Sequence, residues 1–263
     1  ALSIDPSSAD AIEGQIALDL AKQNRTAARE LIENRLRQAP RDGQMWFLAA
    51  QVYATAGDQQ RATDALRRTI DLSPSNLRAF AMLGQIYGAQ GKLREARQQF
   101  ETWIAREPKS IPAHTMVALL FERENDASSA RKEYEKTLTI DPHAAVAANN
   151  LAWMYVDAGE KLDQAQQLAE SAVAQLPEVA DFNDTLGWIY YKKELPAQAR
   201  PYIEKAVTKE GNNPLFHYHL GMVFAKQGED SRAIQTLKHA LSLSSSFPGA
   251  ADAKRTLSDL TIQ

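Results

Sequence analysis

The sequence predicts an all-α fold, an α-solenoid in which about seven helical hairpins stack side by side. The first observation is a row of prolines, separated by 34 residues four times and then by 35, at Pro6, Pro40, Pro74, Pro108, Pro142 and Pro177. Self-similarity at a fixed period of this length is the sequence signature of a repeat architecture. Because proline cannot continue the hydrogen-bond ladder of a helix, each of these prolines is expected to end a helix.

The second observation is that small and aromatic residues recur at fixed places between the prolines. If each proline is position 32 of a 34-residue repeat, position 20 is always alanine. Position 8 is Ala or Gly from the second repeat onward, and position 11 is Tyr or Phe, as at Tyr53 and Phe121. Small residues let two helices approach closely, and large residues fill the space beside them. The pattern therefore predicts two packed helices in each repeat.

The third observation is a turn signal in the middle of most repeats, at Gly57, Gly91, Asn125, Gly159 and Gly228. Gly and Asn adopt the left-handed conformation that ends a helix at low cost. No segment shows the apolar–polar alternation of a strand. Each repeat is therefore expected to be a hairpin of two short helices.

The repeats follow one another along nearly the whole chain, as residues 9–42, 43–76, 77–110, 111–144, 145–179, 180–213 and 214–247. Residues 1–8 are expected to be the tail end of a preceding repeat, because Ala1–Pro6 resembles Thr69–Pro74. The chain is accordingly expected to be a piece of a longer protein. Residues 248–263 are expected to form a capping helix, since a terminal repeat needs a polar outer face.

Three repeats depart from the pattern. The first is degenerate and has Asp19 where the others have an aromatic residue. The fifth carries one extra residue near Lys161, in its hairpin turn. The sixth has Glu194 in place of the turn glycine and Gly211 in place of the closing proline.

The second repeat carries the residues by which a known family is recognised, namely Trp46, Ala49, Ala50, Tyr53, Ala62, Leu66 and Pro74. It resembles the tetratricopeptide repeat (TPR) consensus, and so does the third repeat, from Leu77 to Pro108. The resemblance covers essentially the whole chain and implies a right-handed superhelix. It also implies that positions 2, 5, 6, 9, 12 and 13 of each repeat line a concave groove that binds a protein or peptide.

Composition excludes several classes of partner and site. With a formal net charge of −3 the chain offers no strongly basic face, so nucleic acid is not expected as a partner. No long uncharged apolar run is present, so no segment of this chain is expected to span a membrane. The absence of cysteine excludes disulfides and thiolate metal sites and is compatible with cytosol and periplasm alike.

No arrangement of residues predicts catalysis, a metal site or a cofactor. His217 and His219 are two residues apart, so on a helix they point about 200° apart. One is expected to pack and the other to lie at the groove. Asp181 and Asp184 near a helix start are expected to cap it or to interact with its dipole. The chain is therefore expected to be a binding protein and not an enzyme.

The groove positions of repeats five to seven are the richest in aromatic and polar residues. They supply the predicted partner-binding groove, which consists of Asn149, Asn150, Trp153, Asp184, Trp188, Tyr191, Tyr218, His219 and Met222. Aromatic anchors beside polar groups are typical of binding hot spots. The alternative is that Trp153 and Trp188 merely pack between neighbouring repeats. The third repeat, by contrast, offers the bland set Arg78, Ala81, Met82, Gln85, Gly88 and Ala89.

A finer resemblance rests on Asn149–Tyr155, Leu162–Ala169 and Asp184–Lys192. These segments are similar to bacterial cell-envelope TPR proteins, among them lipoproteins of exopolysaccharide export and of the exosortase (PEP-CTERM) system. The resemblance implies a scaffold in an envelope secretion or assembly system, placed in the cell envelope or periplasm, with the cytoplasm as the alternative. Two other functions stay open: recruitment of substrates for a larger enzyme, and self-assembly, so the oligomeric state is undecided.

Overall fold

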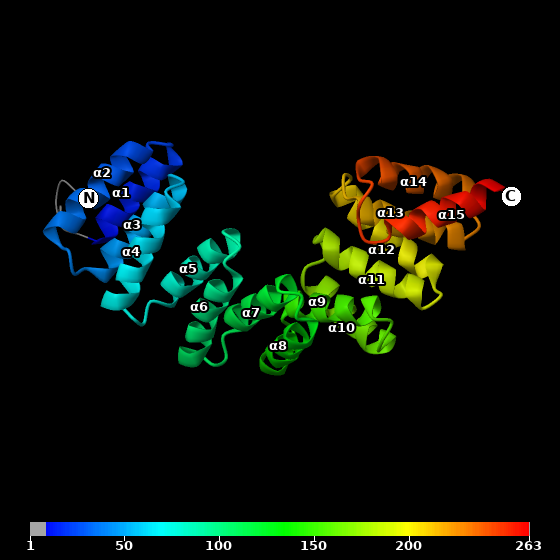
Figure 1. The fold of residues 1–263 in the computed structure, drawn as a ribbon, viewed down its shortest axis with the longest axis horizontal. Coiled ribbons are helices and arrows are strands. Elements are labelled where there is room, and N and C mark those ends of the chain that lie inside the picture. Colours follow the sequence, from blue (N-terminus) through cyan, green and yellow to red (C-terminus); the bar gives the residue numbers. More distant parts are fainter. Residues whose placement is uncertain (1–8, 263) are drawn as a thin grey trace. The chain divides into compact units, whose positions relative to one another are not determined.

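The computed structural model describes residues 9–262, and the expected repeat tail at residues 1–8 lies outside this range. The described part contains fifteen α-helices and no strand, which confirms the predicted all-α fold. In order (Figure 1) they are α1 (Ala9–Ala21), α2 (Arg25–Gln38), α3 (Gly43–Thr55), α4 (Gln59–Leu72), α5 (Leu77–Ala89), α6 (Leu93–Arg106), α7 (Ile111–Arg123), α8 (Ala127–Ile140), α9 (Ala145–Asp157), α10 (Leu162–Gln175), α11 (Ala180–Lys192), α12 (Pro196–Lys209), α13 (Pro214–Lys226), α14 (Asp230–Leu243) and α15 (Ala250–Ile262).

The helices form two compact bodies, which divide after Asp126. The N-terminal body contains α1–α7 and the C-terminal body contains α8–α15, so the two helices of the fourth repeat belong to different bodies. Within each body, consecutive helices pack as antiparallel hairpins that stack side by side (Figure 1). The buried alanines at position 20, such as Ala62 and Ala199, are completely enclosed at the hairpin crossings.

Each hairpin turn holds one residue in the left-handed conformation at position 15. These residues, all with φ between 59° and 81°, are Gln23, Gly57, Gly91, Asn125, Gly159, Glu194 and Gly228. Gln23 and Glu194 adopt it although they carry a Cβ that makes this conformation unfavourable. The extra residue of the fifth repeat, Lys161, is also left-handed, with φ 48°. The insertion is therefore absorbed within the turn, and α10 begins directly after it.

Glycine at position 8 lets the two helices of a hairpin approach more closely than any side chain would allow. A Cβ at Gly187 would lie 2.4 Å from Ile203 Cγ1, and one at Gly221 would lie 2.6 Å from Leu237 Cδ2 and Cγ. In the N-terminal body, a Cβ at Gly84 would lie 2.5 Å from the Phe100 ring. The bulky residues at position 24 thus occupy the space that glycine leaves open.

A hydrogen bond from position 4 to the end of the preceding repeat recurs in both bodies. The Trp46 indole N–H donates to the Pro40 carbonyl at 3.0 Å, and the Asn183 amide donates to the Pro177 carbonyl at 2.8 Å. His114 bonds the Pro108 carbonyl in the same way. These bonds give a partner to the proline carbonyl in the loop that follows α2, α6 and α10. They fix α3, α7 and α11 to the loop that precedes each of them.

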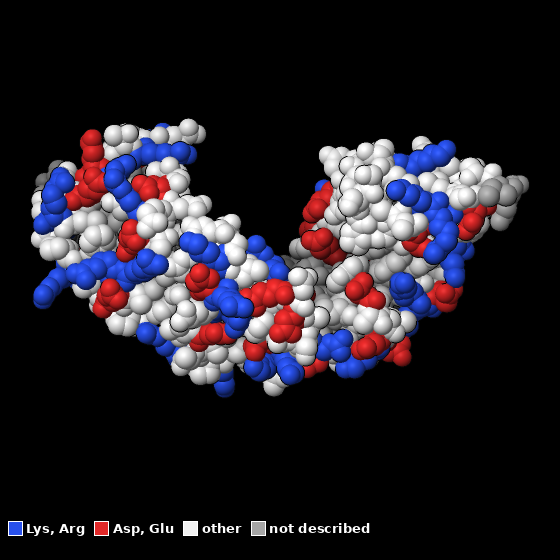
Figure 2. All heavy atoms as spheres, in the orientation of Figure 1, with Lys and Arg blue, Asp and Glu red and all other residues white. Residues whose placement is uncertain are grey.

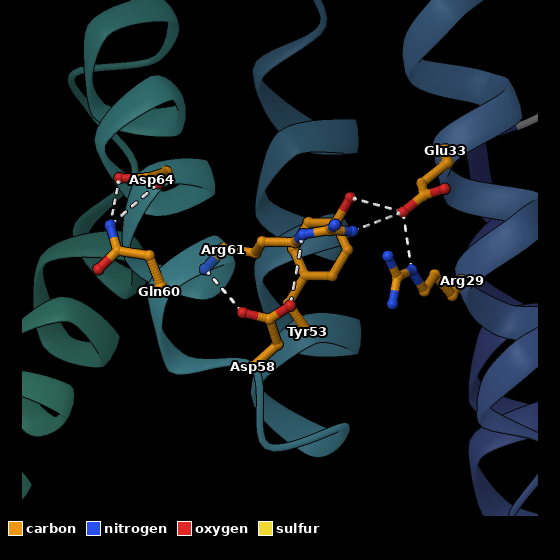
Figure 3. A network of polar contacts seen from close by, with 7 residues as sticks. All are labelled: Arg29, Glu33, Tyr53, Asp58, Gln60, Arg61 and Asp64. Atoms are coloured by element: carbon orange, nitrogen blue, oxygen red, sulfur yellow. Dashed lines mark hydrogen bonds and ion pairs between the residues drawn. The ribbon is translucent and has the colours of Figure 1, made fainter.

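A second recurring bond joins the aromatic residue at position 11 to position 25 of the preceding repeat. Figure 3 shows it in the N-terminal body, where the Tyr53 hydroxyl donates to Glu33 at 3.5 Å. The same carboxylate accepts from Arg29 at 2.8 Å and from Arg61 at 3.3 Å, so three helices, α2, α3 and α4, meet at Glu33. In the C-terminal body the Tyr190 hydroxyl donates to Glu170 at 2.8 Å. Such partly exposed charged contacts contribute little to stability, because water screens them.

Candidate functional site

The predicted groove residues lie on α9, α11 and α13, the first helices of repeats five to seven. These helices lie side by side in the C-terminal body, and we call the surface they form the aromatic wall. Trp188 on α11 occupies its centre. The Trp188 ring stacks on His219 of α13 with centroids 3.9 Å apart and on Tyr191 with centroids 4.6 Å apart. Trp188 therefore joins two helices and is only 6% exposed.

The ring contacts continue on both sides of this stack. The Trp153 ring on α9 lies 6.0 Å from His219, and the Tyr218 ring lies 5.6 Å from Trp188. The Tyr218 hydroxyl donates to Asp252 of α15 at 2.9 Å, which connects the wall to the last helix. Burial, followed by this bond to a carboxylate, raises the pKa of Tyr218. The aromatic wall is thus one continuous set of rings from α9 to α13.

A buried polar pair, Asp184 and His219, links α11 and α13. The His219 Nδ1–H donates to both carboxylate oxygens of Asp184, at 2.9 Å and 2.8 Å. The two side chains are 2% and 3% exposed, so this contact is shielded from water. Buried polar groups are costly unless they are hydrogen-bonded, and each of these residues satisfies the other. The pair positions His219 for its stack on Trp188.

The two asparagines of α9 form a chain of amide hydrogen bonds. Asn149 donates to Asn150 at 3.1 Å, and Asn150 donates to the Tyr134 hydroxyl at 2.9 Å. The Asn149 Oδ1 atom is buried and has no hydrogen-bond partner within the part of the chain that the structure describes. Such an unpaired acceptor is uncommon in folded proteins, because leaving it unpaired costs about 1–3 kcal/mol.

The structure therefore brings the aromatic residues of the predicted groove together with Asp184 but leaves them unequally accessible. Asn149, Asp184, Trp188, Tyr218 and His219 are buried. The half-buried members are Asn150, Trp153, Tyr191 and Met222. Packing between repeats thus accounts for nearly all of the Trp188 surface, whereas part of Trp153 stays accessible. That these residues bind a partner remains a prediction.

His217 and His219 are both buried, so neither lies openly at the groove. His217 is the position-4 residue of its repeat, and its Nε2–H donates to the Gly211 carbonyl at 2.8 Å. Burial is the largest influence on His217 and lowers its pKa, and the neighbouring His239 adds to this effect. Among the described residues, no group of three or more His, Cys, Asp or Glu side chains is placed to hold a metal ion.

Charge is mixed on both bodies. On the face seen in Figure 2, Lys and Arg side chains lie close to Asp and Glu side chains over each of them. Several ion pairs join neighbouring repeats, such as Arg200 of α12 with Glu229, the residue before α14, at 2.9 Å. Within residues 9–262 no helix is long and apolar enough to cross a membrane.

The N-terminal body contains a hollow that no sequence pattern predicted. It has a volume of about 640 Å³ and is lined by α1, α3 and α5, with Trp103 of α6. Its lining includes Arg78, Ala81, Met82 and Gln85, which belong to the set judged bland from the sequence. Its lining mixes small residues such as Ala17 and Ala54 with the aromatic residues Phe47 and Trp103.

Two-helix repeats with small residues at the crossings and a turn at position 15 define a class, the helical-hairpin repeat proteins. Two models of the tetratricopeptide repeat family match the sequence, one over residues 53–120 and the other over residues 15–76 and 185–251. Together these matches cover well over half of the chain. The chain belongs to the tetratricopeptide repeat family.

Solved structures with the same fold share little sequence with this chain. A TPR protein from Parabacteroides merdae has a TM-score of 0.62 and 17% identity, with 97% of this chain and 98% of that chain covered. A chain of the APC/C hetero-tetramer Cut9-Hcn1 has a TM-score of 0.71 and 15% identity, with 97% of this chain covered. This chain spans only 50% of that relative.

A third similar structure is YrrB, described as a TPR protein with an unusual peptide-binding site. Its TM-score is 0.54 at 17% identity, with 70% of this chain and 95% of that chain covered. At these identities the similarities show the fold. Comparison with curated protein sequences gave no match.

Proposed function

We propose that this chain is a scaffold that binds a segment of a partner protein on the aromatic wall of the C-terminal body. TPR proteins generally mediate interactions between proteins, and the wall lies on the first helices of its repeats. The observation that carries the proposal is the rigid ring stack with accessible edges: Trp188 is fixed between His219 and Tyr191, while Trp153 and Tyr191 remain half-buried. Rigid aromatic side chains lose little entropy on binding and are enriched in hot spots.

Polar groups beside the rings support recognition of a peptide main chain. Asn150 is half-buried at the edge of the wall, and the Asn149 Oδ1 atom beside it lacks a donor. A backbone N–H group of a bound segment would supply that donor if the asparagine side chains adjusted to it. Lys192, whose ammonium lies 5.2 Å from the Trp188 ring centroid, adds a cation at the edge of the same surface.

We further propose that the partner belongs to an assembly of the bacterial cell envelope, such as a secretion or exopolysaccharide-export system, with this chain in the envelope or periplasm. The support is the likeness of Asn149–Tyr155 and Asp184–Lys192 to segments of bacterial envelope TPR proteins. Both segments contribute residues to the aromatic wall.

Photo-crosslinking tests the binding surface directly. Tyr191→benzoylphenylalanine places a photoreactive ketone at the accessible edge of the wall, and Lys132→benzoylphenylalanine places it on an exposed face of α8 in the same body. In envelope and cytosolic fractions of the native cell, the Tyr191 variant should yield a discrete protein adduct that the Lys132 variant does not. Equal adducts from both positions, or none from Tyr191, would refute the wall as the binding surface. An adduct found only in the cytosolic fraction would refute the envelope assignment.

A further inference from the structure

We propose that the C-terminal body carries a second kind of site, which binds a neutral aromatic ring with one hydrogen-bond donor, such as a phenol. The site is a space lined by residues of α12, α13 and α14, among them Val207, His217, Leu220, Phe224 and Thr236. We call it the outer hollow. It shares no residue with the aromatic wall and goes beyond the proposed function.

The outer hollow lies on the side of α13 that faces away from the aromatic wall. His217, Leu220 and Phe224 follow one another at intervals of three and four residues, so they share one face of this helix. His219, which belongs to the wall, is two residues from His217 and therefore points about 200° away from it. The outer hollow is thus separate from the surface on which the first helices would receive a partner.

The preceding pair of repeats shows what fits in this place. There, position 23 is Tyr202, whose ring stacks on the position-11 ring of Tyr190 with centroids 5.7 Å apart. In the last pair of repeats the same positions are Thr236 and Phe224, and both line the outer hollow. Threonine carries no ring, and the volume of about 330 Å³ falls within the range of roughly 300–1,000 Å³ that is usual for ligand pockets. A phenol ligand would take the place that Tyr202 fills one repeat earlier.

The lining combines apolar surface with one unused acceptor. Val207, Leu220 and Phe224 supply the apolar surface. His217 is 9% exposed, and its Nε2–H donates to the Gly211 carbonyl at 2.8 Å, so Nδ1 of the neutral ring is an acceptor. This nitrogen has no hydrogen-bond partner among the described residues. A hydroxyl on the ligand would donate to it, and burial, which lowers the pKa of His217, keeps the ring neutral near pH 7.

The charges beside the outer hollow favour a neutral ligand. Arg232 pairs with Glu229 at 2.6 Å and with Glu204 at 3.6 Å, and Glu204 also pairs with Arg200 at 2.8 Å. Because these charges satisfy one another, the described lining offers neither an anion nor a cation an unpaired counter-charge. The exposed ring of His239, which is perpendicular to that of His217 with centroids 4.5 Å apart, adds an aromatic side to the hollow.

Two molecules of nearly the same shape test the site on the full chain. p-Cresol carries the hydroxyl group of tyrosine and toluene lacks it, and the backbone amide NMR signals of the chain follow both titrations. p-Cresol should shift signals around the outer hollow, such as those of Leu220 and Thr236, in a saturable way, and should bind at least threefold more tightly than toluene. Shifts confined to the N-terminal body, or no saturable shift, overturn the proposal.

N-Acetyltyrosinamide, which carries the same phenol on a peptide main chain, identifies the source of the ring. Binding as tight as that of p-cresol would assign the site to a tyrosine side chain of a partner. Binding at least tenfold weaker would assign it to a free small molecule. Either result supports a phenol site.

The residue found one repeat earlier provides the blocking variant. Thr236→Tyr fills the outer hollow with the ring that Tyr202 supplies in the preceding pair, and should abolish the binding of p-cresol while the circular dichroism spectrum is retained. Gln99→Tyr is the matched control, because Gln99 is position 23 of a repeat in the N-terminal body, and it should leave the binding unchanged. Undiminished binding to a folded Thr236→Tyr chain overturns the proposal.

His217→Phe tests the hydrogen bond separately, because it keeps a ring in this place without an acceptor. The variant should bind toluene as the unaltered chain does, which shows that the hollow is intact, and should lose the preference for p-cresol. A preference for p-cresol that survives in this variant overturns the assignment of His217 as the acceptor.

Discussion

The first helices of the two bodies share one repeat geometry but differ in the residues that line the surface between them. Position 9 is Gln51 and Gln85 in the N-terminal body, beside a hollow of about 640 Å³. The same position is Trp153 and Trp188 in the C-terminal body, where the rings stack against His219 and Tyr191. Both bodies thus share the packing residues at positions 8, 11 and 20, whereas position 9 carries an amide beside the open surface and an indole ring in the filled one.

The largest effect on stability is expected when position 9 of the C-terminal body receives the glutamine of the N-terminal body. Trp188→Gln removes a ring that is 6% exposed and leaves His219 and Tyr191 without their stacking partner. The free energy of unfolding should fall by about 3–5 kcal/mol, as for other buried aromatic truncations. The reciprocal Gln85→Trp, at an exposed position, should change it by about 0.5 kcal/mol or less. Chemical unfolding followed by far-UV circular dichroism measures both; equal costs would mean that the two surfaces do not differ in packing.

Breaking the buried pair of Asp184 and His219 should have the next largest effect on stability. Asp184→Ala leaves the His219 Nδ1–H without its acceptor in a site from which water is excluded. The expected loss of stability is about 1–3 kcal/mol. The double variant Asp184→Ala with His219→Ala should be less destabilised than the sum of the single variants, because neither polar group is then left alone. Strict additivity in the same unfolding assay would show that the two side chains are not energetically coupled.

Glycines at position 8 test the part of the scaffold that both bodies share. Gly187→Ala places a Cβ 2.4 Å from Ile203 and 3.0 Å from the Ala199 carbonyl oxygen, which is backbone and cannot easily move. For Gly84→Ala the three nearest atoms all belong to the Phe100 ring, the first at 2.5 Å. Both should lower the melting temperature through overpacking that costs about 1–3 kcal/mol, and Gly187→Ala should cost more. Gly14→Ala, with no atom within 4 Å of the added Cβ, should instead stabilise α1 by about 0.5–1 kcal/mol.

The proline period and the turn signals predicted the helical hairpins, because both report local chain geometry. Position 9 also predicted that Trp153 and Trp188 lie on neighbouring first helices. The period does not report how deep a side chain lies, which depends on residues one repeat away. Asp184 and His219 are 35 residues apart and meet only because α11 and α13 are neighbours. An acid at position 5 followed by histidine at position 6 of the next repeat is the signal that could have revealed the pair. The hollow had no such signal, because its lining comes from four helices, α1, α3, α5 and α6, and mixes small and large side chains.

The pH dependence of stability should distinguish the histidine at position 4, His217, from the asparagine at the same position, Asn183. Burial lowers the pKa of His217, so the folded chain keeps it neutral while the unfolded chain binds a proton near the ordinary value of about 6.5. Its contribution to stability is therefore fully present above pH 6.5 and is lost as the pH falls toward the lowered pKa, by at most about 1.4 kcal/mol per pH unit. His217→Asn, which reproduces the bond of Asn183, should flatten the decline in stability between pH 7 and pH 5. His143→Asn, at an exposed position, should leave that decline unchanged. If His143→Asn flattens the decline and His217→Asn does not, the decline does not come from His217.

The two turns without Gly or Asn offer the smallest effects and the finest comparison between the bodies. Gln23 and Glu194 hold the left-handed conformation, with φ of 59° and 62°, that glycine adopts in four of the other turns. Gln23→Gly should stabilise the chain by several tenths of a kcal/mol, because the strain of the Cβ outweighs the added freedom of the unfolded chain.

Glu194→Gly relieves the same strain but also removes the ion pair with Lys226 of α13. Its gain should be smaller by the weak contribution of an exposed ion pair, and the difference should disappear in 1 M salt, where such pairs are screened. A difference that persists in high salt would show that Glu194 contributes through packing in the turn and not through its charge.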